Sequence, residues 1–210
     1  MISGDYCDLG RDHGLAAGLT AVLDGLDPAA SAQNRLAVLP VTMSLPGGAQ
    51  VLPNALAARE GLAVVRFEAG VAGTGHAGGL TGQRAGALAA VRLGVLTRLL
   101  ELAVGRLTGR RFAGTPLIEQ QLVAGTVADV VALIELSASL DLDDPPAEVT
   151  TAQHDRLTAA GWAVTRLFGA EGYITDHPAL SLYTSTLVAD IWIARADRWK
   201  ELPCSSSMTG

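Results

Sequence analysis

Residues 176–190 hold the densest set of side chains that could do chemistry. A histidine beside a carboxylate, as in Asp176-His177, can act as a general base, and Ser185 and Asp190 could line a polar pocket. His177, Ser185 and Asp190 are therefore the candidates for catalysis. Adjacent residues in a turn rarely face each other, however, and hydroxyls inside helical bundles usually bond to their own helix. The pattern favours a structural role for these side chains.

The other potential ligands and nucleophiles are scattered along the chain. No metal site is expected, because the isolated histidines lack the spacing of metal ligands: His13, His76 and His154. The glycine-rich residues 70–82 contain no phosphate-loop motif and are expected to be a linker. Cys7 and Cys204 lie near opposite ends and could pair, but two cysteines do not make a disulfide framework.

Charge and composition exclude some classes of partner. Fifteen basic and 21 acidic residues give a net charge of −6 without a basic cluster, which argues against nucleic acid. Only 17% of the residues are charged, against about 25% in an average protein, while 49% are apolar. Such a surface favours a protein that is partly covered by an oligomer or a partner.

The sequence predicts a soluble, cytoplasmic protein with no membrane partner. The most apolar stretch, residues 122–136, is interrupted by Asp129 and Glu135 and falls short of the roughly 18 apolar residues of a membrane span. The first dozen residues carry Asp5 and Asp8 and are followed by no apolar segment, which is not the pattern of a signal peptide.

The elements that would position these side chains change type along the chain. A short helix is predicted over residues 15–26, and β-rich runs near residues 36, 49 and 62 predict three or four strands of a small sheet. Helical apolar spacing begins at residue 80. Thr115 and Pro116 are expected to start the second helix, as N-cap and first turn. The expected helices span residues 80–107, 115–140, 146–168 and 178–202.

Short connections between four long helices predict an antiparallel four-helix bundle. The fold class is therefore mainly α, with a small degenerate β-lobe before the bundle. Residues 1–79 would form a short N-terminal segment and the remnant β-lobe, residues 80–202 the bundle, and residues 203–210 a disordered tail.

Two motifs resemble the acyl-CoA dehydrogenase family. Residues 110–121, R-R-F-A-G-T-P-L-I-E-Q-Q, resemble the family's turn R-x-x-F-G-x-P-L, which is followed by a helix with a glutamine. Residues 169–178, G-A-E-G-Y-I-T-D-H-P, followed by Leu182-Tyr183, resemble G-G-x-G-Y-T-x-x-x-P and a later L-Y. The resemblance covers roughly residues 36–200. It implies a truncated protein that keeps the C-terminal helical bundle and the end of the middle β-domain.

The resemblance also implies a cofactor contact shared with a partner. The family residues that match Arg110 and Gln121 contact the flavin pyrophosphate or adenosine across a subunit boundary, and the family phenylalanine falls on Phe112 or Ala113. This chain would then lend these side chains to a composite site. The alternative is that Arg110 and Arg111 only cap a helix end, and that Gln121 is a surface residue.

The family's catalytic machinery is not expected in this chain. The glutamate that removes the α-proton falls on Ile193, or on Gln83 or Arg84, and none of these can act as a base. The first 35 residues hold no counterpart of the family's N-terminal helical domain and of half its β-domain. No cofactor is therefore expected to bind to this chain alone, and FAD would bind only in a site completed by a partner.

Three functions are compatible with these observations. The first is a small non-catalytic or half-site subunit of a heteromeric acyl-CoA dehydrogenase-like enzyme, in specialised natural-product metabolism, with a larger family member as its partner. The second is a subunit of a complex that reuses the fold without flavin, for elimination or ring closure of the aziridine type. The third is a free-standing binding module. A flavin in the purified complex would separate the first from the second, and monomeric behaviour alone would favour the third.

Overall fold

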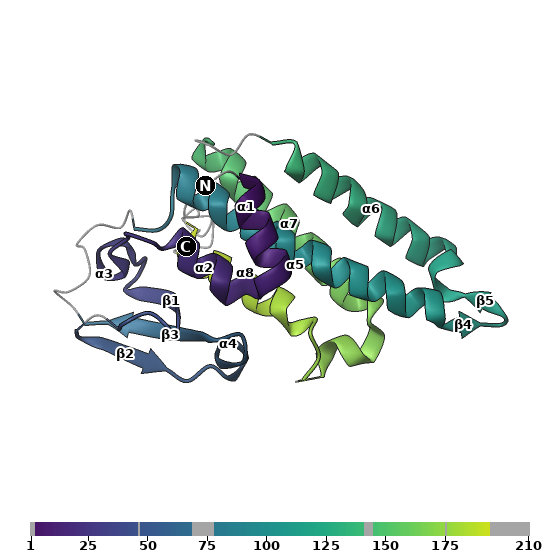
Figure 1. The fold of residues 1–210 in the computed structure, drawn as a ribbon, viewed down its shortest axis with the longest axis horizontal. Helices are drawn as coiled ribbons and strands as arrows, with labels where there is room; N and C mark the ends of the chain where they lie inside the picture. The colour runs from purple at the N-terminus through teal and green to yellow at the C-terminus, as the bar shows by residue number, and fades with distance from the viewer. Residues whose placement is uncertain (1–2, 46, 69–77, 141–144, 175, 194–210) are drawn as a thin grey trace, which may run out of the picture.

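The computed structural model describes residues 3–45, 47–68, 78–140, 145–174 and 176–193. It is mainly helical, with a small antiparallel sheet at one end (Figure 1). The predicted fold class is confirmed: four long helices run in alternating directions after the sheet. They are α5 (Gly82–Gly109), α6 (Gln121–Ala138), α7 (Ala147–Leu167) and α8 (Leu180–Trp192).

Helix α5 is the centre of the molecule, and other helices cover it on more than one side. Every residue from 85 to 96 is buried, including Arg92. A helix buried on all faces needs neighbours all round. Helices α7 and α8 pack on α5 from one side, and the N-terminal helices pack on it from another.

The N-terminal residues form a bent helix that lies directly on α5. Helix α1 (Ser3–Asp8) continues through a π-helical turn, η1 (Leu9–His13), into α2 (Gly14–Val22). The predicted helix over residues 15–26 is thus present but begins and ends earlier. The contact is made backbone to backbone, because a Cβ on Gly94 would lie 2.0 Å from the Cys7 carbonyl oxygen. Only glycine allows such a close approach.

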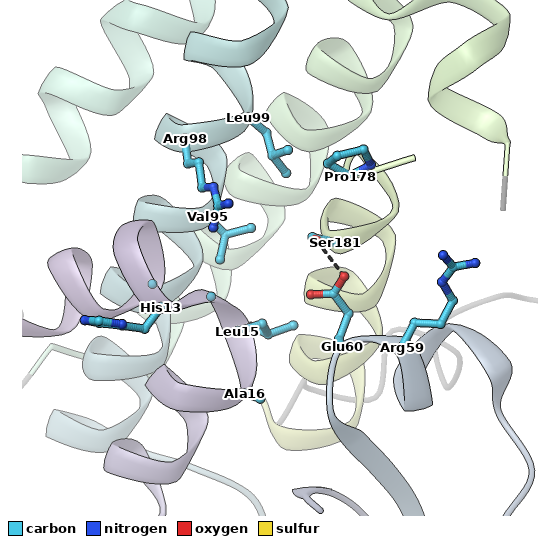
Figure 2. Close-up of a pocket in the computed structure, with 12 residues that line it drawn as sticks. His13, Leu15, Ala16, Arg59, Glu60, Val95, Arg98, Leu99, Pro178 and Ser181 are labelled. Atoms are coloured by element: carbon cyan, nitrogen blue, oxygen red, sulfur yellow. Dashed lines mark hydrogen bonds between the residues drawn. The ribbon is translucent and has the colours of Figure 1, made fainter. Parts of the chain in front are cut away.

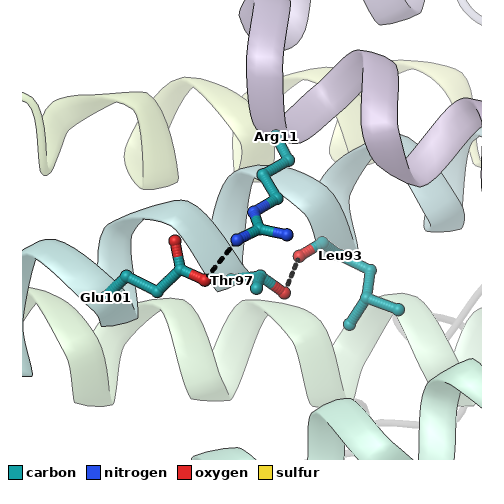
Figure 3. A network of polar contacts seen from close by, with 4 residues as sticks. All are labelled: Arg11, Leu93, Thr97 and Glu101. Carbon is teal, nitrogen blue, oxygen red and sulfur yellow. Dashed lines mark hydrogen bonds and ion pairs between the residues drawn. The ribbon is translucent and has the colours of Figure 1, made fainter.

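An ion pair beside this contact joins the same two helices. Arg11 Nη2 lies 2.7 Å from Glu101 Oε1 of α5 (Figure 3). Close by, the Thr97 hydroxyl donates to the Leu93 carbonyl oxygen at 2.9 Å, so it bonds within its own helix. Because both charged side chains are about half exposed, the ion pair contributes little to stability. The close packing at Gly94 is therefore the main contact between the two helices.

The β-lobe is a three-stranded antiparallel sheet of β1 (Leu36–Pro40), β2 (Ala49–Leu52) and β3 (Leu62–Phe67), in the order β1-β3-β2. A short helix, α3 (Pro28–Ser31), precedes the sheet, and the side chain of Asp27 caps it. Helix α4 (Ala55–Arg59) lies between β2 and β3 in the chain. Trp192 at the end of α8 donates its indole N–H to the Val38 carbonyl oxygen at 2.9 Å, which ties the bundle to the sheet.

The predicted start of the second bundle helix is wrong. Thr115 and Pro116 form strand β5 (Thr115–Pro116), which pairs with β4 (Arg111–Phe112), and a 3-10 turn, η2 (Leu117–Glu119), follows before α6 begins. The physical reason is the backbone of the two residues between β4 and β5, Ala113 at φ 50° and Gly114 at φ 86°. Two successive residues with positive φ are typical of a tight hairpin turn.

The fourth bundle helix is shorter than predicted. It ends at Trp192 instead of near residue 202, because Ile193 adopts an extended backbone and bridges to Leu80. The Leu80 N–H donates to the Trp192 carbonyl oxygen at 2.7 Å, so a β-type bond replaces the next helical turn. Residues 194–210, which include the predicted tail and Cys204, lie outside the described residues.

Candidate functional site

Three arginines meet at the end of the bundle where α5 stops. Arg106 and Arg110 come from the last turn and the C-cap of α5, and Arg166 comes from the last turn of α7. They line a pocket of about 250 Å³, here called the arginine pocket. Its remaining lining is mostly apolar: Leu107, Leu117, Val123, Leu167, Phe168 and Gly169.

One carboxylate faces this positive charge. Glu171, in the 3-10 turn η3 (Gly169–Tyr173), forms ion pairs with Arg106 and, at 3.7 Å, with Arg110. The hydrogen bond from Arg106 is the main reason that the pKa of Glu171 is lowered from its ordinary value. Glu171 therefore stays ionised at neutral pH and offsets part of the positive charge.

The arginine pocket still has unused donor capacity. Arg106 Nη2 is buried and has no hydrogen-bond partner within the described residues. A buried donor without a partner costs free energy. Because this atom is closed off from solvent, the exposed side chains of Arg110 and Arg166 are the donors that an anionic group in the pocket would meet first.

Of the three predicted cofactor residues, only Arg110 lines this pocket. Phe112 is 68% exposed on β4, and Gln121 is exposed at the first position of α6. Arg111 is not part of the pocket, since it donates to the Gly114 carbonyl oxygen at 2.8 Å and braces the hairpin. Sequence analysis missed Arg106 and Arg166, which lie outside the motif and reach the pocket only in the folded bundle.

The three catalytic candidates are not brought together. His177 Nδ1 accepts the Ala179 N–H at 3.1 Å, and its ring packs edge-on against Phe168, so it stabilises the turn before α8. Asp176 pairs with Arg59 rather than with its neighbour His177. Asp190 is exposed near the end of α8.

Ser185 belongs to a buried polar network around Arg92. The Arg92 guanidinium donates to the Ser185 hydroxyl at 2.9 Å and to His154 Nδ1 at 2.8 Å. With Nδ1 accepting, the His154 Nε2–H donates to the Ala85 carbonyl oxygen at 3.2 Å, which assigns a neutral ring. The network joins α5, α7 and α8 in the core. An arginine within the apolar residues 85–96 was the sequence signal for it.

The positions of the family's catalytic glutamate offer no base. Ile193 is 2% exposed in the core, and Gln83 is exposed on the first turn of α5. Arg84 donates to the Val22 carbonyl oxygen at 2.5 Å and holds α2 against α5.

Among the described residues, no group of three or more histidine, cysteine or acidic side chains could hold a metal ion. The pKa of the Cys7 thiol is raised, mainly by burial.

A second and larger pocket lies where four elements meet, and the sequence analysis missed it. It measures about 350 Å³ and is here called the junction pocket (Figure 2). Its walls come from the N-terminal helix, α5, the end of α4 and the start of α8. The polar side chains that line it are His13, Arg59, Glu60, Arg98 and Ser181.

Helix α6 is poorly covered by the rest of the chain. Only Val130 and Ser137 are buried. Leu122 is 87% exposed, and Val131 and Leu136 are also exposed. By length and composition α6 could cross a membrane, with a mean hydropathy of 1.5 over 18 residues, although a single such helix is weak evidence. The exposed residues Leu122, Ala124, Ala128, Val131, Ala132 and Leu136 are here called the α6 face.

Comparison with solved structures finds acyl-CoA dehydrogenases, the family that the two motifs resemble. A variant of the Tcur3481-Tcur3483 steroid ACAD matches with a TM-score of 0.48 and 18% identity, over 68% of this chain and 44% of that one. Butyryl-CoA dehydrogenase from Megasphaera elsdenii matches with a TM-score of 0.46 and 18% identity, over 70% and 45%. FkbI, for biosynthesis of the methoxymalonyl extender unit of the Fk520 polyketide, matches with 0.43 and 19%, over 68% and 46%.

These matches describe a similarity of fold and nothing finer. The chain spans less than half the length of each of these structures, and every TM-score is below 0.5. Neither a protein-family profile nor a curated protein sequence gives a significant match. The activity, ligand and partner of this chain must therefore be inferred from its own residues.

Proposed function

We propose that this chain is the small half-site subunit of a heteromeric acyl-CoA dehydrogenase-like complex in specialised metabolism of the cytoplasm. Its larger partner, another member of that family, would cover the α6 face. The arginine pocket would contact the phosphate end of a ligand held mainly by the partner. The observation that supports this proposal best is the meeting of Arg106, Arg110 and Arg166 at one pocket with a single opposing carboxylate, Glu171.

The arginine pocket fits a phosphate rather than a whole cofactor. The exposed guanidinium groups of Arg110 and Arg166 can donate to phosphate oxygens, and Arg106 adds positive charge beside them. A volume of about 250 Å³ is below the usual range of roughly 300–1,000 Å³ for a complete ligand site. The pocket therefore suits one end of a larger molecule.

The α6 face supports the proposed partner. Four residues separate β5 from helix α6, and Val123 on the first turn of α6 lines the arginine pocket. A chain that covered the first turn of α6 would therefore lie close to the pocket. Asp129 and Glu135 are the only charged residues of the helix, and both are exposed among the residues of the α6 face. The surface that would be covered is therefore mostly apolar but carries two carboxylates.

FAD is the cofactor that the resemblance implies, and Arg110 is the residue of this pocket that would contact its pyrophosphate. When bound, it would supply a hydride acceptor. The non-redox alternative needs the same phosphate contact without the flavin, because phosphates also occur in thioester carriers. In both cases this chain would bind and orient the phosphate-bearing ligand, since neither Ile193 nor Arg84 provides a base.

The test is co-expression with longer acyl-CoA dehydrogenase-like chains from the same organism. We expect a stable complex of fixed stoichiometry by light scattering. Visible flavin absorbance in that complex would select the redox function, and a colourless complex would select the non-redox one. The Leu122→Lys variant should abolish the complex, whereas the Val51→Lys variant, at an exposed residue of β2, should leave it intact. A soluble monomer that forms no complex with any of these longer chains would overturn the proposal and favour a free-standing binding module.

A further inference from the structure

The junction pocket carries opposite charges on two of its walls. Arg98 of α5 and Glu60, the C-cap of α4, approach it from opposite sides in Figure 2. The structure shows no hydrogen bond or ion pair for Arg98 among the residues it describes, although the side chain is exposed to solvent. The Arg98 guanidinium is therefore available to a ligand on the α5 side of the junction pocket.

The acidic wall is held in place by the bundle. The Ser181 hydroxyl on the first turn of α8 donates to Glu60 Oε1 at 2.6 Å. The second carboxylate oxygen, Oε2, remains able to accept a hydrogen bond. Arg59 points away from this pair and forms an ion pair with Asp176, so it does not neutralise Glu60. The His13 ring also points away from Glu60 in Figure 2.

Apolar side chains line the rest of the pocket. These are Leu15, Val95, Leu99 and Pro178. The N-terminal wall is shaped by the π-helical turn η1, since Gly10, His13 and Gly14 all line the pocket. Such π-helical turns are rare and occur frequently at functional sites.

We propose that the junction pocket binds a small aliphatic zwitterion of the amino-acid class. Its carboxylate would bind to Arg98, its ammonium group to Glu60, and its short aliphatic part would pack against Leu15 and Val95. A simple carboxylate would be repelled by Glu60, and a simple amine would be repelled by Arg98. A volume of about 350 Å³ matches a small molecule rather than a peptide.

This site is independent of the arginine pocket. No residue lines both pockets, and Arg98 and Arg106 lie two helical turns apart along α5. Binding there does not require FAD or a phosphate, so failure of the proposed function would leave this proposal intact.

The experiment uses the purified full chain, or the complex with which it purifies, and measures ligand binding by calorimetry and saturation-transfer NMR. The probes are L-norvaline, pentanoate and butylamine, which carry both charges, only the carboxylate, or only the amine. We expect saturable binding of L-norvaline, with each of the other two binding about tenfold more weakly or not at all.

Two substitutions with matched controls locate the ligand. Arg98→Gln and Glu60→Gln should each weaken L-norvaline binding about tenfold or more, because each removes one charge-assisted contact. Arg156→Gln on α7 and Glu68→Gln after β3 change the same residue types on the surface elsewhere and should have no effect. Arg98→Gln breaks no hydrogen bond or ion pair among the described residues, so it remains informative if Glu60→Gln loosens the contact with α8.

Two results would overturn the proposal. One is the absence of saturable L-norvaline binding by folded protein. The other is equal binding of pentanoate and L-norvaline with no effect of Glu60→Gln, which would show an anion site without selection for the ammonium group.

Discussion

At the scale of single residues, Arg110 is the predicted site residue that the fold places in a pocket. It shares Glu171 with Arg106, but its distance to that carboxylate, 3.7 Å, leaves its fork able to bind another anion. Phe112 and Gln121, which were predicted from the same motif, lie on the surface outside the arginine pocket. Any role for them would require a partner that covers the hairpin and α6.

Arg110→Ala is expected to weaken ligand retention in the complex about ten- to a hundredfold, because a charge-assisted bond contributes roughly 1.5–3 kcal/mol. The melting temperature should change little, since a basic residue at a helix end contributes only about 0.3–1 kcal/mol. Retention is measured by equilibrium dialysis of FAD, with pyrophosphate as a competitor. Arg111→Ala is the control, since Arg111 bonds to Gly114 and not to the pocket. Unchanged retention of FAD by the Arg110→Ala variant would indicate that Arg110 only caps the helix.

Glu171 should make the stability of this end of the bundle depend on pH. Its pKa is lowered by Arg106 from the ordinary value of 4.5, so the stabilisation is present above pH 4.5 and is lost as the pH falls through the lower folded pKa. Thermal unfolding between neutral pH and pH 3 should therefore show wild type losing more stability on acidification than Glu171→Gln, which has no carboxylate to protonate. Parallel curves for the two proteins would refute the ion pair. The effect should be small because Glu171 is partly exposed.

At the scale of elements, the crossing of the N-terminal helix over α5 decides the shape of the molecule. Gly10, Gly18 and Gly94 lie at this crossing, and a Cβ at any of them would overlap the opposite helix. Because backbones that touch this closely cannot move apart without losing the buried contacts around them, the crossing is rigid. It also sets the wall of the junction pocket, to which η1 contributes.

Gly94→Ala should destabilise the protein by roughly 1–3 kcal/mol or more, since its methyl group would overlap the Cys7 carbonyl group. Gly105→Ala lies in the same helix with open space around it and should instead stabilise by roughly 0.5–1 kcal/mol. Urea denaturation of the two variants gives the comparison. Equal stabilities would show that the N-terminal helix does not pack on α5 in this way.

At the scale of the whole molecule, the chain has a well-filled core and one poorly covered helix. The core is continuous from Leu15 of α2 through the sheet to Trp192 of α8. Helix α6 contributes only Val130 and Ser137 to the buried interior, and its apolar face remains in contact with solvent. This face is the surface that the proposed partner would cover.

On its own the chain is expected to self-associate through the α6 face. The Leu122→Lys/Leu136→Lys double variant should shift the mass measured by light scattering to that of a monomer, because charge on both ends of the face opposes burial. The matched control is Val41→Lys/Val51→Lys, at two exposed valines of the β-lobe, which should leave the mass unchanged. A wild-type monomer at high concentration would contradict the expectation. Recovery of the chain only with lipid vesicles would point to a membrane instead.

The sequence by itself determined the fold class and most helix positions. The apolar spacing of residues 80–107 and 146–168 is a local property, and helices form wherever that spacing is long and regular. Local rules failed at Thr115-Pro116 and after Trp192. There the deciding factors were the positive φ of Ala113 and Gly114 and the pairing of Ile193 with Leu80, which is distant in sequence.

Only the tertiary structure decided which side chains meet. Arg106, Arg110 and Arg166 come from two helices, and Glu60 and Arg98 come from the end of α4 and the middle of α5. No local pattern records such pairs, because the register of one helix against another is set by packing, down to Gly94 against the Cys7 carbonyl group. The motif at residue 110 located one arginine of one pocket. The fold supplied the other two and the whole of the junction pocket.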